Sequence, residues 1–246
     1  MDNYLYLAAS GAKQNLNELA VRANNLANAQ TDAFKADLTQ ARSMQAFGEG
    51  LPTRVFAMEE RVASDFDAGP LKTTGRVLDV AINGQGWLVV QDSNGQEALS
   101  RLGNLKFDAT GMLVNGNDQP VLGEGGPIFA PLPIEKVEIA NDGLITVRPQ
   151  GAPANALEEI GQLRLTNPPK DTLTKSEDGL FRQLENPDYP TDVSVTIVSG
   201  SLEGSNVNPV AEMVQMLDAQ RQFDMLVKMM KTAEENDRAG AQLLRV

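Results

Sequence analysis

The sequence predicts an α+β protein, mainly β, with terminal N- and C-helices paired as a coiled coil and a central all-β domain of many short strands. Two observations predict this architecture. Apolar or small residues recur alternately three and four apart at both ends of the chain, and strand patterns separated by turn signals fill the middle. We therefore expect a discontinuous helical coiled-coil domain (1–30 with 205–246), an extended connector (31–75) and an all-β domain (76–204).

The first helix is expected over residues 3–28. A stripe of apolar or small residues, which we call the N-terminal seam, runs through it: Leu5, Ala9, Ala12, Leu16, Leu19, Ala23 and Leu26. Such a stripe suits either an amphipathic helix on its own globular core or a coiled-coil seam, and small alanines favour close approach of a second helix. Gly11 weakens this helix by about 1 kcal/mol relative to Ala.

The predicted helix ends in Asn24-Asn25-Leu26-Ala27-Asn28, since amides propagate a helix poorly and terminate it well. This end is either a frayed terminus or a hydrogen-bonded corner, after which residues 30–35 turn the chain. Residues 36–75 show no sustained period, and we expect short strands only near 54–56 and 71–72. The breakers in this connector are Gly48, Gly50, Pro52, Gly69 and Pro70.

Strand patterns dominate residues 76–200. We expect strands near 78–82, 87–90, 137–139, 144–147, 163–165, 180–182 and 193–198. The turn signals are Asn94-Gly95, Thr110-Gly111, Asn115-Gly116 and Asn141-Asp142-Gly143. No helical pattern intervenes, so the sequence favours an all-β domain over a parallel α/β sheet.

The last helix is expected from Asn208, which can cap it, and Pro209, which fits the first turn. Its stripe, the C-terminal seam, comprises Met216, Ala219, Phe223, Leu226, Met230 and Ala233. The N-terminal helix offers a partner for it, in the same chain or a neighbour. Val210, Met213, Leu217 and Val227 fall off this seam, and apolar surface beyond one seam indicates packing among several subunits.

Composition restricts the chemistry. The chain has 246 residues with 21 basic and 33 acidic side chains, a net charge of −12, which disfavours nucleic acid and anionic membranes as partners. It has neither Cys nor His, which excludes the usual zinc sites and Ser/His or Cys/His catalytic pairs. No apolar run approaches the ~20 residues of a membrane span, and the N-terminus lacks the features of a cleaved Sec signal peptide.

No motif points to catalysis, a cofactor or a metal. Gly84-Gln85-Gly86 lacks the third glycine and the helix of a dinucleotide loop, and 123–127 lacks the Lys-Ser/Thr of a phosphate loop. We interpret both as turns. The acid pairs at 59–60, 158–159 and 234–235 are most simply solvated surface charge, Asp142 is a turn former, and Asp92, Asn94 and Glu97 do not fit a calcium loop.

The termini together resemble the bacterial flagellar rod and hook proteins. The matching segments are Ala23-Asn24-Asn25-Leu26-Ala27-Asn28-x-x-Thr31-x-Ala33-Phe34-Lys35, Leu78-Asp79-Val80-Ala81-Ile82-x-Gly84-x-Gly86-Trp87-x-x-Val90, Arg101-x-Gly103-Asn104, Leu202-Glu203-Gly204-Ser205-Asn206-Val207-Asn208-Pro209-Val210-x-Glu212-Met213 and Arg221-x-Phe223. The resemblance covers nearly the whole chain. The chain length and residues 121–128 look most like the proximal rod members, with the distal rod protein as the alternative. The family usually has Gly where this chain has Ala33, which leaves the shape of that corner open.

The resemblance implies a structural subunit of the basal-body rod, a drive shaft that transmits torque and surrounds the export channel. Its implied partners are further copies, inner proximal rod subunits, the distal rod protein, the flagellar type III export apparatus and the rod cap. Export without a cleaved signal peptide, a periplasm-spanning location and no direct membrane insertion are also implied. The expected assembly interface comprises both seams together with Asn24, Asn25, Asn28, Phe34, Asn206, Asn208, Pro209, Met213, Leu217 and Val227.

Two other classes remain as alternatives. A coiled-coil and β adaptor or adhesin outside the flagellum would share the architecture but lack the asparagine-rich and Ser-Asn-Val-Asn-Pro signatures. An enzyme that uses paired carboxylates, for example on polysaccharide, would need two acids that converge in one pocket.

Overall fold

The computed structural model describes residues 2–39, 41–45, 55–59, 63–153, 156–183 and 188–243. The chain forms two compact units. We call them the helical unit (Met1–Ala29, Ala36–Asp65 and Val207–Val246) and the β unit (Gln30–Lys35 and Phe66–Asn206). The expected breakers Gly48, Gly50 and Pro52 and the acid Glu60 lie outside the described residues.

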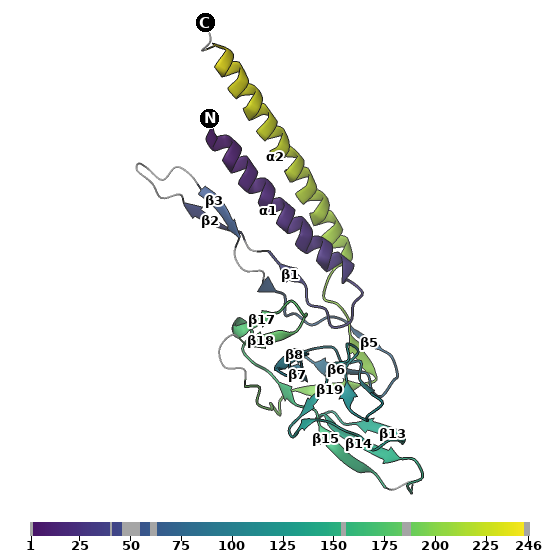
Figure 1. Ribbon diagram of the computed structural model, residues 1–246. Coiled ribbons are helices and arrows are strands. Elements are labelled where there is room, and N and C mark those ends of the chain that lie inside the picture. Colours follow the sequence, from purple (N-terminus) through teal and green to yellow (C-terminus); the bar gives the residue numbers. More distant parts are fainter. Residues whose placement is uncertain are drawn as a thin grey trace. The chain divides into compact units, whose positions relative to one another are not determined.

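The helical unit is built on α1 (Asp2–Ala27) and α2 (Pro209–Leu243), which confirms the two terminal helices. They lie side by side and run antiparallel, so that the two chain ends lie at the same end of the pair (Figure 1). Two antiparallel ribbons complete the unit. They pair β1 (Asp37–Leu38) with β4 (Ala63–Ser64) and β2 (Ala41–Gln45) with β3 (Val55–Glu59), and α1 contacts both β1 and β3.

The start of α2 confirms the predicted cap. Asn208 Oδ1 accepts hydrogen bonds from the N–H groups of Val210 at 3.1 Å and Ala211 at 3.2 Å. These are two of the first-turn donors that no residue within the helix can satisfy, and Pro209 beside them has no N–H to satisfy. Residues 208–211 therefore fix where the helix begins.

The β unit consists of short antiparallel strands, which confirms a strand-rich central region. Its longest strands are β13 (Ile134–Ile139) and β14 (Leu144–Pro149), which form a three-stranded sheet with β15 (Glu158–Gln162). The largest sheet among the described residues has five strands, in the order β16-β7-β8-β18-β17. These strands are β7 (Trp87–Gln91), β8 (Glu97–Ser100), β16 (Leu165–Thr166), β17 (Leu173–Lys175) and β18 (Phe181–Gln183), and a 3-10 turn, η1 (Lys170–Thr172), precedes β17.

The β unit also contains four two-stranded ribbons among its described residues. They pair β5 (Leu71–Thr73) with β20 (Ser201–Glu203), β6 (Val80–Asn83) with β19 (Thr196–Ser199), β9 (Lys106–Phe107) with β10 (Leu113–Val114), and β11 (Leu122–Gly123) with β12 (Gly126–Pro127). The β5–β20 ribbon joins the first part of the unit to its last part. The connector expected over 31–75 is thus divided: 36–65 forms part of the helical unit, and 66–75 belongs to the β unit.

The core of the β unit has two clusters. The larger gathers aliphatic side chains that are almost completely buried, including Leu88, Val90, Leu105, Ile145 and Leu163. The smaller is aromatic, with the ring centroids of Trp87 and Phe181 4.6 Å apart and Phe66 packed edge-on against both. Burial of this apolar surface is the main force that stabilises the unit.

Most predicted turns are confirmed. The turn at Asn94-Gly95 joins β7 to β8. In it, Asp92 Oδ1 accepts hydrogen bonds from the N–H groups of Asn94 and Gln96, both at 2.8 Å. The turn at 115–119 differs from a simple Asn-Gly turn. There Asp118, not Gly116, takes a positive φ of 60°, and Asn115 accepts the N–H groups of Asn117 and Gln119 at 3.0 Å.

The two glycine-rich motifs are turns, as interpreted. Residues 84–86 link β6 to β7 with positive φ at both glycines, and a Cβ on Gly86 would lie 2.5 Å from a Val195 methyl group. Glu124 and Gly125 connect the β11–β12 hairpin. Among the described residues, no helix is long and apolar enough to cross a membrane.

Candidate functional site

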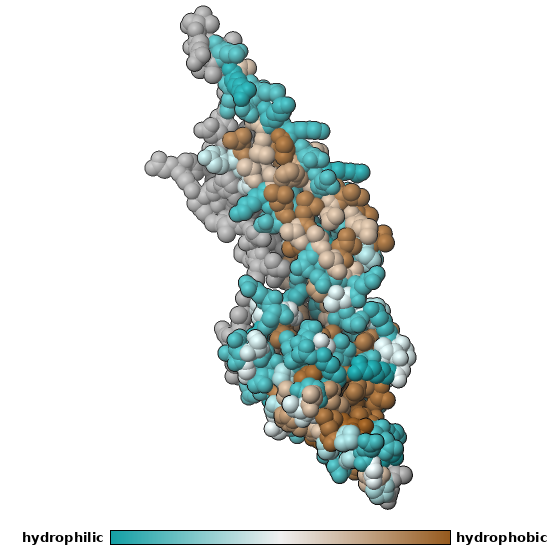
Figure 2. Space-filling model, turned by 45° about the vertical axis from the view of Figure 1, so that its right-hand side comes forward, coloured by the Kyte–Doolittle hydropathy of each residue, from teal (hydrophilic) through white to brown (hydrophobic). Residues whose placement is uncertain are grey.

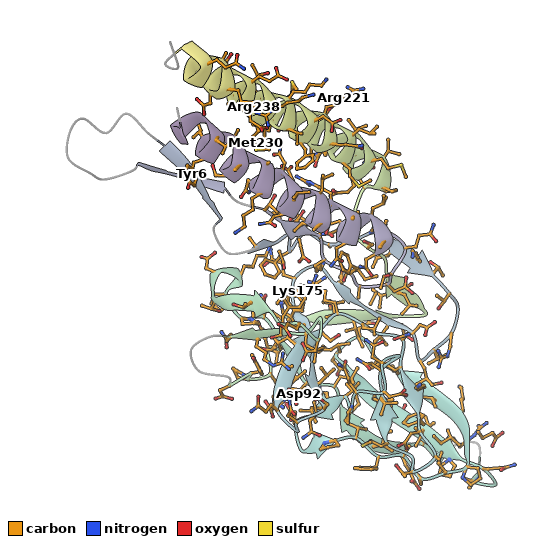
Figure 3. All side chains as sticks on the ribbon, turned by 45° about the horizontal axis from the view of Figure 1, so that its top comes forward. Tyr6, Asp92, Lys175, Arg221, Met230 and Arg238 are labelled. Carbon is orange, nitrogen blue, oxygen red and sulfur yellow. The ribbon has the colours of Figure 1, made fainter. Side chains whose placement is uncertain are left out.

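The C-terminal seam is the inward side of α2. Ala219 is 3% exposed, and all the other residues of the C-terminal seam are partly buried, whereas the positions beside them are exposed. Figure 3 shows Met230 on the side of α2 toward α1, whereas Arg221, with 78% of its side chain exposed, projects away. The spacing alone therefore identified the face of α2 that packs within the chain.

The N-terminal seam is inward only in part. Ala12 is buried and Leu19 and Leu26 are partly buried, but the rest of the seam is exposed: Leu5, Ala9, Leu16 and Ala23. The buried face of α1 is turned by about one residue and includes Ala8, Asn15 and Asn25. The periodicity of apolar residues missed this face because Asn15 and Asn25 lie on it. Hydrogen bonds to Asp37 and Glu212 satisfy the buried Asn25 amide.

Gly11 belongs to the inward face of α1. A Cβ built on it would lie 3.3 Å from Leu226 Cδ1 of α2, which is tighter than an ordinary van der Waals contact. The missing side chain, which lowers helix propensity, thus lets α1 come close to a seam residue of α2.

A polar network fills one end of the helix pair. Glu212 of α2 is 8% exposed, and its carboxylate accepts hydrogen bonds from Asn25 Nδ2 at 3.2 Å and from Arg22 Nη1 at 3.3 Å. Asn25, with no exposed surface, also exchanges two hydrogen bonds with the backbone of Asp37, both at 2.9 Å. The asparagine-rich end of α1 is therefore a hydrogen-bonded corner, in which Asn28 Nδ2 also donates to Asn24 Oδ1 at 2.8 Å.

The chain after α1 turns at Ala33, which has a φ of +61°. A glycine would adopt this left-handed conformation without strain. The backbone of the corner therefore has the conformation typical of glycine, although the residue is alanine. The Ala33 N–H donates to the Glu203 carbonyl at 2.8 Å, and the Asn206 N–H donates to the Phe34 carbonyl at 3.3 Å. Lys175 Nζ lies 4.3 Å from the centroid of the Phe34 ring, and Figure 3 shows Lys175 in the β unit.

Glu203 is the centre of a buried ionic cluster that the sequence interpretation did not single out. It is 2% exposed, and its Oε1 accepts hydrogen bonds from Lys35 Nζ at 2.7 Å and the Gly69 N–H at 3.0 Å. Its Oε2 accepts one from Arg101 Nη1 at 2.8 Å. Burial alone would raise the pKa of Glu203, but the charge of Arg101 and the hydrogen bonds from Lys35 and Arg101 outweigh it, so the pKa lies below its ordinary value.

This cluster joins the sequence signatures to one another. Lys35 Nζ also donates to the Asp67 carbonyl, and Arg101 Nη2 donates to the Gly84 carbonyl, both at 2.7 Å. The Arg101 guanidinium carbon lies 5.3 Å from the centroid of the Trp87 ring. Four of the five matching segments, all except Arg221-x-Phe223, thus contribute to one buried site. The charged residues inside these otherwise apolar or small-residue motifs were the signal that could have revealed it.

The acids considered above as candidates are exposed or form turns where the structure describes their surroundings. Glu158, Glu159, Glu234 and Glu235 are exposed, and Asp142 accepts the Leu144 N–H at 3.0 Å as a turn former. A cleft of about 320 Å³ in the β unit has Asp32 and Asp178 in its lining, but each pairs with a base, Lys72 and Arg182 respectively. Within the described part of the chain, no three carboxylates group as metal ligands would.

Comparison with known families gives matches at both ends and in the middle of the chain. Residues 5–35 match the family described as "Flagella basal body rod protein", and residues 81–147 match "Flagellar hook protein FlgE/F/G D1 domain". Residues 198–243 match "Flagellar basal body rod FlgEFG protein C-terminal". The N- and C-terminal matches include the corner after α1, most of both helices, and Lys35 and Glu203 of the buried cluster, and the middle match includes Arg101.

Individual relatives are similar to this chain over nearly all of their length. The flagellar basal-body rod protein FlgF of Salmonella typhimurium is 40% identical over 99% of both chains, and that of Escherichia coli is 38% identical over 99% of both. FlgF of Caulobacter vibrioides is 34% identical over 99% of this chain and 98% of its own. FlgG of Agrobacterium fabrum is 31% identical over 94% and 95%. This chain therefore belongs to the family of flagellar basal-body rod proteins, within which it resembles FlgF more than FlgG.

Proposed function

We propose that this chain is a structural subunit of the proximal flagellar rod and that it polymerises through α1 and α2. Family membership and the similarity to FlgF support the rod assignment. The finer elements are that the helices pack as a coiled coil with those of neighbouring subunits, around the export channel, and that the chain is exported by the type III apparatus. On this proposal the chain transmits torque and catalyses no reaction.

The observation that carries the proposal is the exposed apolar surface of the helix pair. Each helix exposes large apolar side chains outside the face that it turns inward. The exposed large apolar residues are Leu5, Tyr6, Leu7 and Leu16 on α1, and Val210, Met213, Val214, Leu217, Met225, Val227 and Met229 on α2. Figure 2 shows this apolar surface along the helical unit. A single chain that leaves so many large apolar side chains in water on adjacent turns has a surface suited to neighbouring subunits.

The free energy gained by burying these apolar side chains is large enough to drive association. Burial of apolar surface contributes roughly 25 cal/mol per Å², so a few such side chains per contact offset the entropy lost on docking. Val210 is 69% exposed and Leu217 is 54% exposed, which leaves most of their area available. The partners we propose are further copies, the inner proximal rod subunits and the distal rod protein, with the rod cap and the export apparatus as transient partners.

Leu217→Asp tests the proposal. The change places a charge on the exposed face, so we expect incorporation into basal bodies to fall at least about tenfold, because a buried unpaired carboxylate is strongly unfavourable. The matched control is Gln220→Asp, which adds the same charge at another exposed position of α2. The fluorescence of Trp87, the only tryptophan, checks that the β unit remains folded. Incorporation of Leu217→Asp at the control level would contradict assembly through this face.

The distal rod is the second candidate, because FlgG of Agrobacterium fabrum is similar over 94% of this chain. The same basal bodies separate the two candidates. Labelled chain imaged between the inner rod and the distal rod supports the proximal assignment, and label along the distal segment supports the alternative.

A further inference from the structure

The C-terminal seam does not by itself specify how far α2 lies along α1. Its residues are all apolar or small and repeat with one period, so a shift by seven residues places Phe223 where Met216 was and Met230 where Phe223 was. Met adapts to gaps of different shape, and Ala fits beneath many side chains. Packing of this seam therefore distinguishes poorly between registers one heptad apart.

Glu212 occupies the next seam position toward the N-terminus of α2, four residues before Met216, and it is charged. It is 8% exposed, yet its carboxylate has partners on α1: Asn25 at 3.2 Å and Arg22 at 3.3 Å. Both partners are restrained. Asn25 is fixed by its two hydrogen bonds to Asp37, and Arg22 also contacts Glu18 at 3.5 Å. The carboxylate is therefore satisfied at one position along α1.

We infer that Glu212, held by Arg22 and Asn25, sets the register in which α2 packs on α1. In a register shifted by a heptad, the Glu212 carboxylate leaves both donors and Asn25 loses an acceptor, while the apolar seam packs almost as well as before. A buried carboxylate without partners is strongly unfavourable, so the shifted registers are excluded by this one residue. A single polar residue at a seam position is a known means of fixing register between helices.

Engineered disulfides test this in the full-length chain, which contains no cysteine of its own. The pair Gly11→Cys with Leu226→Cys reports the observed register, because the two positions face each other. The pairs Gly11→Cys with Ala219→Cys and Gly11→Cys with Ala233→Cys report registers shifted by one heptad in either direction. Oxidation of dilute monomer keeps the cross-links within one chain, and Trp87 fluorescence confirms a folded β unit.

We expect only the 11–226 pair to cross-link when Glu212 is present. With Glu212→Leu, we expect at least a tenfold rise in cross-linking of one shifted pair. Glu212→Gln keeps an acceptor for Asn25 and Arg22 and should retain the observed register, as should Asp218→Leu, which removes an exposed charge from the same helix. Exclusive 11–226 cross-linking in Glu212→Leu would overturn the inference. So would loss of all cross-links, since the apolar seam must still pair. The result is independent of rod incorporation and therefore of the proposed function.

Discussion

The two units differ in how completely they bury their apolar residues. In the β unit, side chains such as Leu88, Leu105 and Ile145 have no exposed surface and form a continuous core. In the helical unit, the inward face of α1 carries Asn15 and Asn25, and large apolar residues such as Leu16 and Leu217 are exposed. The β unit thus buries a core of its own, whereas the helical unit exposes the apolar surface that we propose neighbouring subunits cover.

The buried carboxylates of the two units, Glu203 and Glu212, differ in how tightly their partners hold them. Glu203 of the β unit is held by two cations at 2.7 and 2.8 Å. Glu212 of the helical unit has one cation, Arg22, at 3.3 Å, and the amide of Asn25 at 3.2 Å. Charge-assisted hydrogen bonds are shorter and stronger than those between neutral groups, so Glu203 is the more tightly held of the two carboxylates. Glu203 therefore stabilises the interior of the β unit, whereas we infer for Glu212 a role in setting the helix register.

Charge is also unequal between the units. The β unit contains 20 acidic and 11 basic residues, so it carries −9 of the chain's net −12. Like charge opposes close association of β units with one another, and the remaining −3 of the helical unit opposes association less strongly. This distribution supports the proposed polymerisation through the helices.

Hydrogen exchange should show the largest difference between the two units. In a verified monomer, we expect amides in the middle of α1 and α2 to exchange at least about tenfold faster than those of β7 and β8. Helices need tertiary packing to be stable in water, and regions with few buried apolar contacts open at low free energy. Mass spectrometry of peptic fragments measures both sets in one sample. Equal protection of helices and strands would show that the helical unit is as complete as the β unit.

The Glu203 cluster provides the next test. Glu203→Gln removes the carboxylate charge that contacts both buried cations, Lys35 and Arg101. We expect it to lower the free energy of unfolding of the β unit by about 3–5 kcal/mol, as breaking a buried ion pair does. Urea titration followed by Trp87 fluorescence measures the change. Glu158→Gln, at an exposed acid of β15, is the matched control and should change stability by less than about 0.5 kcal/mol.

The difference in unfolding free energy between wild type and Glu203→Gln should depend on pH. This dependence shows how much of the stabilisation comes from the charge of Glu203 rather than from its packing. Its pKa is lowered in the folded state, so the contribution of the charge is fully present above the unfolded value of about 4.3 and is lost as the pH falls through the folded pKa. Each unit of lowering corresponds to about 1.4 kcal/mol. We therefore expect wild type and Glu203→Gln to differ most at neutral pH and to converge in acid. A constant difference down to low pH would mean that the carboxylate charge is not what stabilises the unit.

The sequence predicted what depends on local periodicity. Both helices, the Asn208 cap and the inward face of α2 follow from residues a few positions apart, and all three are confirmed. The inward face of α1 did not follow, because Asn15 and Asn25 break the apolar pattern. Glu203 and Lys35 are 168 positions apart in the sequence, and no local pattern indicates that they meet. Such long-range polar contacts are visible only once the fold brings their segments together.

Substitution of Ala33 should give the smallest change in stability. Ala33 lies in the first segment of the β unit, a few residues after the end of α1. Its φ of +61° costs an L-residue about 1–2 kcal/mol, which Ala33→Gly would remove. Glycine also gains about 0.4–1 kcal/mol of freedom in the unfolded chain, so we expect a net stabilisation of about 0.5–1 kcal/mol. Ala68→Gly is the control, because Ala68 is exposed and has no positive φ, and it should be destabilising. Urea titrations of both variants by Trp87 fluorescence should therefore shift in opposite directions, and a loss of stability in Ala33→Gly would mean that its backbone is not strained.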